Sequence, residues 1–249
     1  MRALDIKENY PLKDLTTFKI GGSARYFVGV HSIEELFNAL CFMRRHKLNL
    51  FVLGGGSNVL ISDRGFDGLV LKVNTTGVNI IKEDEQAVRV SVAAGVCWDE
   101  FVANAVEAGW WGIENLSYIP GNAGAFAIQN VGAYGQEASA VVDYVEVYNI
   151  ATDDIRTINK KECVFSYRTS VFNSTLQGKY IILNTVLKLK KHSEPNINYY
   201  DVRKYFEHRS TPTLQQMREA ISRIRSKKLP DPAQIGNAGS FFKNLIVKE

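Results

Sequence analysis

The chain has 249 residues, of which 45% are hydrophobic and 22% are charged, and its formal net charge is +4. This composition is typical of a folded protein and excludes wholesale disorder. Lys and Arg are spread among Asp and Glu along the chain, which disfavours a nucleic-acid-binding protein, although a mild positive surplus suits a ligand that carries phosphates.

The N-terminal segment has no apolar core of the kind that a signal peptide needs, and no stretch is long enough to cross a bilayer. We therefore expect a cytoplasmic protein without membrane contact. The cysteines and histidines show no metal-ligand spacing, so we expect no metal site. These residues are Cys41, Cys97, Cys163, His31, His46, His192 and His208.

The first part of the chain predicts a strand, a helix and a strand. Ser32 and Glu35 have capping-box spacing, and apolar residues then recur at helical intervals, which predicts a helix over 33–46. The segment LNLFVLGGGSNVLI has the pattern of a buried strand broken by three glycines, and DRGFDGLVLKVN predicts a turn and a further strand. Together these elements predict an α/β unit over residues 1–74.

A second unit of mixed strands and helices is predicted over residues 75–229. The segments VRVSVAAGV, VVDYVEVYNI and KYIILNTVLKLK are predicted strands because they are rich in β-branched residues that alternate with others. A helix beginning at Trp98 is stopped by Gly109. Thr213 and Gln216 cap a predicted helix over 214–227, which ends before two prolines.

The triple glycine of VLGGGSN follows a predicted strand and can present successive backbone N–H groups to a phosphate, with Ser57 and Asn58 beside them. It is not a dinucleotide fingerprint, because that motif requires a helix next and VLISD predicts another strand. An NAD-linked Rossmann dehydrogenase is therefore disfavoured. A tight turn without a ligand would use the same residues.

A second glycine-rich tract, IPGNAGAFAIQNVGAYG, would let a backbone approach a flat or phosphorylated ligand closely. Its alternative is a long loop that only connects a helix to a strand, but loops of this length in compact domains are usually functional. Two further signals are weak by themselves. Arg168, next to Tyr167, suits a carboxylate, a phosphate or an enolate, and Ser240 lies between a glycine and two phenylalanines without a GxSxG elbow.

Four blocks in this order are specific as a set: LGGGSNVLI, IENLSYIPGNAGAFAIQNVGAYG, ECVFSYRTSVF and KLPDPAQIGNAGSFFKN. The chain resembles the UDP-N-acetylenolpyruvoylglucosamine reductases, the MurB flavoenzymes of bacterial peptidoglycan synthesis. The resemblance implies an α/β (α+β) fold, namely the two-lobed FAD-binding fold of the vanillyl-alcohol-oxidase/PCMH type. It also implies a third, substrate-binding domain, of which residues 230–249 would be only the start.

The implied reaction uses FAD as the cofactor and NADPH as the co-substrate to reduce the enolpyruvyl group of a UDP-sugar, giving UDP-N-acetylmuramate. The resemblance assigns the stabilisation of an enolate to Arg168 and the supply of a proton to Ser240. It assigns substrate binding to Tyr167, Tyr199, Lys228 and Asn244. It assigns cofactor binding to Gly54, Gly55, Gly56, Ser57, Asn58, Pro120, Gly121, Gly124, Gln129, Asn130, Gly132 and Arg225. We expect the protein to be a monomer.

Two departures from the family pattern leave a second hypothesis open. Phe126 and Ala127 stand where the family usually has a small residue and a proline. The catalytic glutamate that the family carries in its third domain has no counterpart in this sequence. The alternative to a reductase is therefore a flavin-binding or nucleotide-sugar-binding protein without turnover. Both hypotheses predict a yellow protein.

Overall fold

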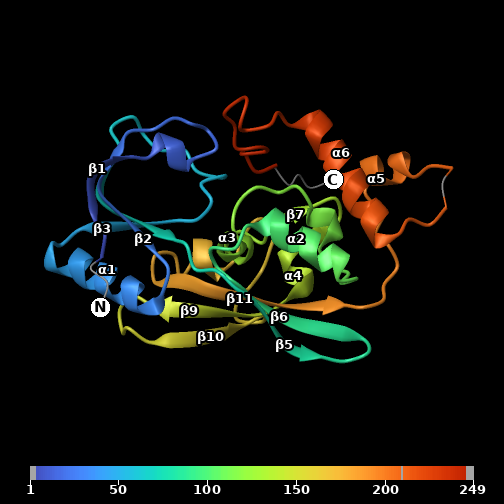
Figure 1. Cartoon of the computed structure of the whole chain (residues 1–249), viewed down its shortest axis with the longest axis horizontal. Coiled ribbons are helices and arrows are strands. Elements are labelled where there is room, and N and C mark those ends of the chain that lie inside the picture. Colours follow the sequence, from blue (N-terminus) through green and yellow to red (C-terminus); the bar gives the residue numbers. More distant parts are fainter. Residues whose placement is uncertain (1–3, 209, 245–249) are drawn as a thin grey trace.

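The computed structural model describes residues 4–208 and 210–244, and two β-sheets organise them (Figure 1). The first sheet has the strand order β1-β2-β4-β3. Its strands are β1 (Lys7–Pro11), β2 (Ser23–Val30), β3 (Asn49–Leu53) and β4 (Phe66–Val73). β1 is antiparallel to β2, whereas β2 and β3 both run parallel to β4.

The second sheet is antiparallel throughout, with the order β10-β9-β11-β6-β5. Its strands are β5 (Val78–Glu83), β6 (Ala87–Ala93), β9 (Val142–Asn149), β10 (Ile155–Asn159) and β11 (Tyr180–Lys190). A two-stranded ribbon joins β7 (Gly132–Ala133) to β8 (Gln136–Glu137). β5 is an edge strand, and all six of its residues are exposed.

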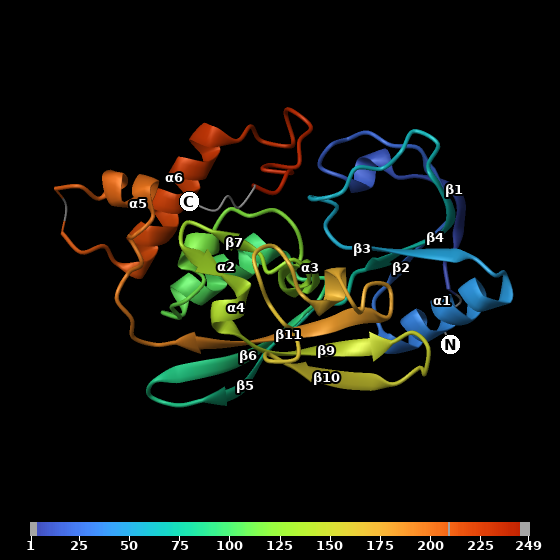
Figure 2. The same ribbon diagram turned by 180° about the vertical axis from the view of Figure 1, so that it is seen from behind.

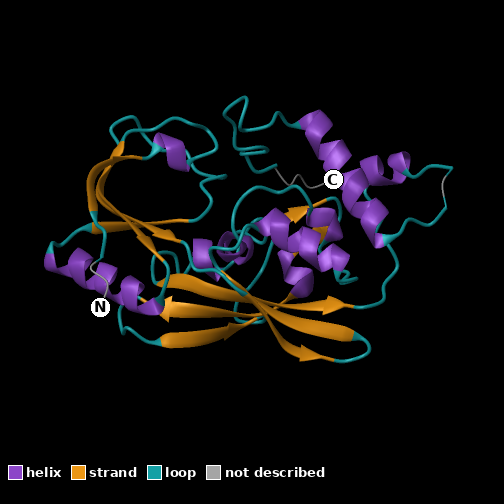
Figure 3. Cartoon of the chain, viewed as in Figure 1, coloured by secondary structure: helices purple, strands orange, loops and turns teal. Residues whose placement is uncertain are grey.

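The helices lie in three places. α1 (Ile33–Arg45) connects β2 to β3, and α2 (Trp98–Glu107), α3 (Ala123–Ile128) and α4 (Ala138–Val141) gather on one face of the five-stranded sheet (Figure 3). α5 (Tyr200–Tyr205) and α6 (Leu214–Lys228) lie at the opposite end of the molecule from the first sheet. Three short 3-10 helices complete the set, over Lys13–Leu15, Glu114–Leu116 and Val171–Asn173.

One hydrophobic core runs under both sheets. It joins Leu69 of β4 to Val90 of β6 and Leu187 of β11, and all three side chains are fully buried. A smaller cluster holds α5 against α6 through Val202, Met217 and their neighbours. The division of the chain into units at residues 74 and 229 stays a prediction.

The two sheets are also tied at the end of the molecule where α1 approaches the turn between β9 and β10 (Figure 2). The guanidinium of Arg44 binds both carboxylate oxygens of Asp153, at 2.7 and 2.8 Å, and it donates a third hydrogen bond to the carbonyl of Ile150. The hydroxyl of Tyr148 donates to the same carboxylate at 2.9 Å.

The structure confirms the predicted helix starts. The Ser32 hydroxyl accepts a hydrogen bond from the Glu35 N–H at the start of α1, and Thr213 and Gln216 form a reciprocal capping box at the start of α6. α2 ends as expected before Gly109, whose φ is +76°.

The prediction that VLISD forms a strand is wrong. Residues 59–63 form no ladder with any described strand, and the Gly22 N–H makes only a single hydrogen bond to them, to the Ser62 carbonyl at 2.9 Å. The next strand begins only at Phe66. The glycine run is followed by irregular chain rather than by a helix. A dinucleotide fingerprint is therefore still excluded, because that motif requires a helix at this point.

Candidate functional site

The two glycine-rich tracts are far apart in sequence but meet in space, where a hydrogen bond joins residues 63 positions apart. The Ser57 hydroxyl donates to the Pro120 carbonyl at 2.9 Å, and the Asn58 amide donates to the Gln129 side chain at 2.6 Å. We call residues 54–58 and 120–124 the glycine seam. The turn after β3 and the loop before α3 therefore form one surface.

Most glycines of the seam are required by the chain itself. A Cβ added to Gly55 would lie 2.6 Å from the Asn122 side-chain oxygen and 2.7 Å from the Gly121 Cα. One added to Gly56 would overlap the Leu15 carbonyl, and one added to Gly124 would lie 2.6 Å from the Ala94 Cβ. These glycines let two backbones touch.

Gly54 differs from its neighbours. A Cβ there would meet only the Ala125 side chain, at an ordinary 3.8 Å, and the φ of Gly54 lies outside the left-handed region. Neither space nor backbone conformation within the described chain therefore requires a glycine at this position. Room kept free of a side chain beside clustered amides is what the close approach of a phosphate needs.

A second observation beside the seam also points to a missing partner. The Thr17 N–H donates to the Gly56 carbonyl at 3.1 Å, while the Thr17 hydroxyl is buried and has no hydrogen-bond partner among the described residues. Buried hydroxyls in folded proteins are normally satisfied. The seam thus offers amides, a spare hydroxyl and open space, and these residues fit a dinucleotide cofactor.

Arg168 lies at the tip of a tight turn, where Ser166 and Thr169 form a β-bridge and Arg168 has a φ of +54°. Its guanidinium stacks over the Tyr167 ring, with 5.8 Å between the guanidinium carbon and the ring centroid. One of its terminal nitrogens lies 3.6 Å from where a Cβ of Gly132 would be. Among the described residues, this guanidinium has no carboxylate in ion-pair range.

Asn130 holds that turn in place. Its side-chain amide donates to the Ser166 carbonyl at 3.0 Å and to the Glu137 carboxylate at 2.9 Å, and its oxygen accepts from the Ser139 N–H at 2.8 Å. The side chain, predicted to contact the cofactor, is thus used in protein contacts. It connects the second glycine tract to the turn that carries Arg168.

A third group of predicted residues surrounds Tyr134. The Tyr134 and Tyr199 rings pack edge to face with their centroids 5.2 Å apart, and the Lys228 ammonium binds the Asp201 carboxylate at 2.5 Å. Burial raises the pKa of Tyr134, whereas the positive charges of Arg225 and Lys228 oppose that shift. The hydrogen bond to Asp201 raises the pKa of Lys228.

Arg225 donates from its Nε to the Tyr118 carbonyl at 2.9 Å, and burial lowers the pKa of its guanidinium. The sequence analysis missed Tyr134, Asp201 and Tyr118 as members of this group. The signals were present, because Tyr134 stands inside the GAYG segment and Asp201 follows Tyr199 by two residues.

The C-terminal segment contacts the turn that carries Arg168 and the residues beside the glycine seam. Lys243 donates to the Thr169 hydroxyl at 3.4 Å, Phe241 packs on Phe18 with 5.7 Å between centroids, and the Asn237 N–H donates to the Thr17 carbonyl. Ser240 and Asn244 are both exposed. Within residues 4–208 and 210–244, no hydrogen bond joins Ser240 to Arg168.

Phe126 and Ala127 turn away from the seam. Phe126 stacks on Trp98 at 3.8 Å between centroids, with 2% of its surface exposed, and Ala127 is fully buried. Both residues of this departure from the family pattern therefore lie in the core.

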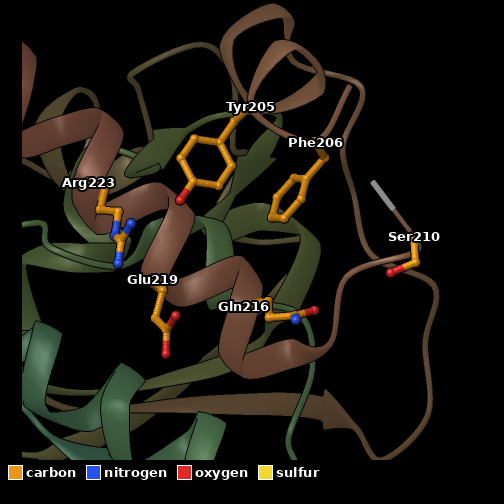
Figure 4. A pocket seen from close by; sticks show the side chains of 6 residues that line it. All are labelled: Tyr205, Phe206, Ser210, Gln216, Glu219 and Arg223. Atoms are coloured by element: carbon orange, nitrogen blue, oxygen red, sulfur yellow. The ribbon is translucent and has the colours of Figure 1, made fainter. Parts of the chain in front are cut away.

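A separate hollow of about 480 Å³ lies on the outer side of α5 and α6 (Figure 4). It is lined by Tyr205, Phe206, Ser210, Gln216, Glu219 and Arg223, none of which was predicted to be a site residue. In the described part of the chain, no cluster of three or more His, Cys, Asp or Glu residues could hold a metal ion. No described helix is both long enough and apolar enough to span a bilayer.

Comparison with known proteins decides the family. A family model described as an FAD binding domain matches residues 24–159. The UDP-N-acetylenolpyruvoylglucosamine reductase of Amoebophilus asiaticus is 43% identical over 248 residues, which cover 99% of this chain and 73% of that protein. The chain belongs to the UDP-N-acetylenolpyruvoylglucosamine reductase family.

Solved structures agree with this MurB assignment. The reductase MurB from Thermus caldophilus superposes with a TM-score of 0.69 at 26% identity, covering 97% of this chain and 75% of that one. The VAO-type flavoprotein MtVAO615 from Myceliophthora thermophila gives a TM-score of 0.50 at 18% identity, over 68% of this chain and 32% of that one. The expected α/β FAD-binding fold of the VAO/PCMH type is confirmed.

Proposed function

We propose that this MurB-family chain binds FAD at the glycine seam and, with NADPH as co-substrate, reduces the enolpyruvyl group of UDP-N-acetylglucosamine enolpyruvate to UDP-N-acetylmuramate for peptidoglycan synthesis. Gly54 carries the proposal, because the described chain gives no steric or conformational reason for a glycine there. The protein would act in the cytoplasm as a monomer. Residues 1–74 and 75–229 would be the two FAD-binding lobes, and 230–249 would begin the substrate-binding domain.

The seam would hold the pyrophosphate of FAD through the amides of Gly54 to Gly56 and the polar side chains of Ser57 and Asn58. The second tract would contact the cofactor with backbone from Pro120, Gly121, Gly124 and Gly132 and with Gln129. Asn130 would contribute by holding the turn of Arg168 in place through its hydrogen bond to the Ser166 carbonyl. Bound FAD would supply the hydride chemistry, and the chain's own residues supply alignment and charge.

Arg168 would stabilise the negative charge that develops when a hydride adds to a double bond next to a carboxylate. A guanidinium keeps its charge at every working pH and offers two parallel N–H groups to a carboxylate or enolate. The absence of a carboxylate partner for Arg168 among the described residues supports this role. Its turn is also fixed by Asn130 and by the Asn173 amide, which donates to the Arg168 carbonyl at 3.2 Å.

Ser240 would then deliver a proton to the carbon that carries the negative charge. A hydroxyl is a weak acid, but it can donate when it is positioned at the reacting atom while charge develops. The hydrogen bond from Lys243 to Thr169 supports the proposal, because it brings the segment after Ser240 to the residue that follows Arg168. Lys228, Tyr199, Tyr167 and Asn244 would bind the substrate around these two groups.

The test is NADPH oxidation measured in the FAD-loaded protein with and without the enolpyruvyl UDP-sugar. The proposal predicts that NADPH is consumed in proportion to the UDP-sugar added. A yellow protein that binds the UDP-sugar but never consumes NADPH in response to it would favour the binding-protein hypothesis. A protein that takes up no FAD would contradict both.

A further inference from the structure

We propose that Asp99 is a positioning residue for the cofactor site: it fixes the backbone of Tyr118, and Tyr118 in turn holds the guanidinium of Arg225. The inference rests on the proposed function and on the cofactor-binding role that the family resemblance assigns to Arg225, whose positive charge would then lie beside the flavin. Asp99 is the second residue of α2 and stands outside every block that carries the family resemblance.

The Asp99 carboxylate has two partners from distant parts of the chain. Its Oδ1 accepts hydrogen bonds from the Tyr118 N–H at 2.5 Å and from the Arg218 guanidinium at 2.7 Å, and its Oδ2 accepts from Arg218 at 3.1 Å. Only 28% of the Asp99 side chain and 18% of the Arg218 side chain is exposed. The carboxylate therefore joins α2 to α6 and also binds the loop before α3, which contains Tyr118.

Tyr118 adopts a backbone conformation that needs such support. Its φ is +60°, in the left-handed region that bulky residues rarely adopt. The residue is 44% exposed, so burial of its side chain alone does not fix it. The two polar groups of its backbone are both used, since its N–H donates to Asp99 and its carbonyl accepts from the Arg225 Nε at 2.9 Å. Loss of the Asp99 contact would free this residue and leave the Nε of Arg225 without a fixed acceptor.

The same part of the chain also supports the glycine seam. Pro120, two residues after Tyr118, accepts the hydrogen bond from Ser57, and the N–H of Trp98 donates to the Gly121 carbonyl at 2.9 Å. The first turn of α2 thus holds the loop on both sides of Pro120. Asp99 and its neighbour Trp98 thus fix the position of this loop relative to the turn after β3.

A purely structural role is the competing explanation, because Asp99 lies in the first turn of a helix and forms an ion pair. The two explanations differ in what the bound flavin would report. Weaker helix packing changes the melting temperature and the fraction of protein loaded with FAD. A displaced guanidinium also changes the charge beside the flavin, and this changes the midpoint potential of the flavin that remains bound.

The experiment compares the FAD dissociation constant and the flavin midpoint potential of the holoprotein in four forms: unmodified, Asp99→Ala, Arg225→Met and the double variant. We expect Asp99→Ala to weaken FAD binding about tenfold, as for the loss of one charge-assisted hydrogen bond. We expect both single variants to lower the midpoint potential, and the double variant to lower it no further than Arg225→Met alone.

Two controls separate positioning from stability. Asp153→Ala removes a comparable carboxylate, which is 31% exposed and also binds an arginine through both oxygens, and it should lower the melting temperature without moving the potential. Asp99→Asn keeps an oxygen that can accept from the Tyr118 N–H while removing the charge that faces Arg218. It should retain a potential close to that of the unmodified protein even if Asp99→Ala fails to fold.

An unchanged potential in FAD-saturated Asp99→Ala would overturn the inference, as would additive shifts in the double variant. A potential that falls in Asp99→Asn as far as in Arg225→Met would overturn it as well. These outcomes leave the proposed function intact, because each is measured on protein that has bound FAD. If the unmodified protein takes up no FAD, the proposed function fails first and this inference falls with it.

Discussion

The hydroxyl of Ser57 donates a hydrogen bond to the carbonyl of Pro120 across 2.9 Å and 63 residues of sequence. This bond joins the turn after β3 of the first sheet to the loop before α3, which packs on the second sheet. Both tracts can touch one ligand only because they already touch each other. The glycines at 55 and 121 make that approach possible, since side chains there would collide with the opposite tract.

The first prediction concerns Gly55, which the packing of the chain requires, and Gly54, which we assign to ligand binding. Gly55→Ala should destabilise the FAD-free protein by about 1–3 kcal/mol, because the new Cβ would push the two tracts apart. Gly54→Ala should leave the melting temperature of the FAD-free protein nearly unchanged and weaken FAD binding. Thermal unfolding and FAD titration of both variants provide the measurement, and equal behaviour of the two would contradict this assignment.

The second prediction concerns the proton donor. Ser240→Ala should leave the reduction of the flavin by NADPH nearly intact, because no substrate carbon is protonated in that half-reaction. Reoxidation of the flavin by the enolpyruvyl UDP-sugar should slow by about 100-fold or more, the range of general-acid contributions. Stopped-flow absorbance follows both steps, and equal slowing of the two would show that Ser240 has a structural role.

The third prediction is that Arg168→Lys is not a conservative change. A compact ammonium cannot reproduce the planar two-pronged contact of a guanidinium, so turnover should fall while FAD binding is kept. Arg156→Lys is the matched control, because Arg156 is an exposed arginine on β10 that pairs with Asp154. Full turnover in Arg168→Lys would remove Arg168 from the proposed mechanism.

The fourth prediction follows from the contact between Lys228 and Asp201. A phosphate-bearing substrate that binds Lys228 must compete with this carboxylate, so Asp201→Asn should lower KM for the UDP-sugar. A partly exposed ion pair contributes up to about 1 kcal/mol, which limits the change to about fivefold. Steady-state kinetics provide the measurement, with Asp67→Asn as the control on an exposed pair with Arg25. A higher KM would mean that Asp201 orients Lys228 for the substrate.

The fifth prediction concerns pH and the tie between α1 and the β9–β10 turn. Hydrogen bonds from Arg44 lower the pKa of Asp153 in the folded protein, so its contribution to stability is present above about pH 4 and is lost as pH falls further. Burial raises the pKa of Tyr148 to about 12, so its contribution is present below about pH 10 and is lost as pH rises towards 12. Chemical unfolding across pH should show both losses, and Asp153→Asn should reduce the acid loss.

Elements with a strong local signal were predictable. α1 and α6 combine a capping residue with apolar residues at helical spacing, and β9 and β11 combine β-branched residues with alternation. Such features act within a few residues and need no knowledge of the rest of the fold.

Elements defined by their partners rather than by their own residue pattern were not predictable. β5 has six exposed residues and no alternation in burial, and it is a strand because β6 supplies its hydrogen bonds. Residues 59–63 have the composition of a strand, but the neighbouring Gly22 offers only an isolated contact there. α3 is a helix of only six residues inside a glycine-rich tract, too short to be stable alone, and the stacking of Phe126 on Trp98 packs it against the core.

The site divides in the same way. The two glycine tracts stand out in the sequence and Arg168 is a weak signal there, whereas the contact between the two tracts is visible only in the structure. Asp99 carries no signal of its own, because it acts through contacts with Tyr118 and Arg218. Tyr118 and Asp201 stand near predicted site residues in the sequence, but their contacts with Arg225 and Lys228 are visible only in the structure. Asn130 was predicted to touch the cofactor, which stays a prediction, and the structure adds that its side-chain amide holds the turn of Arg168.

The most direct test of the account is the absorbance spectrum of the purified chain after incubation with FAD and removal of the unbound cofactor by gel filtration. The account predicts a yellow protein that retains about one FAD per chain, and a Gly54→Ala variant that retains less under the same conditions. A colourless, folded protein that keeps no FAD would contradict the claim that the glycine seam is a flavin site.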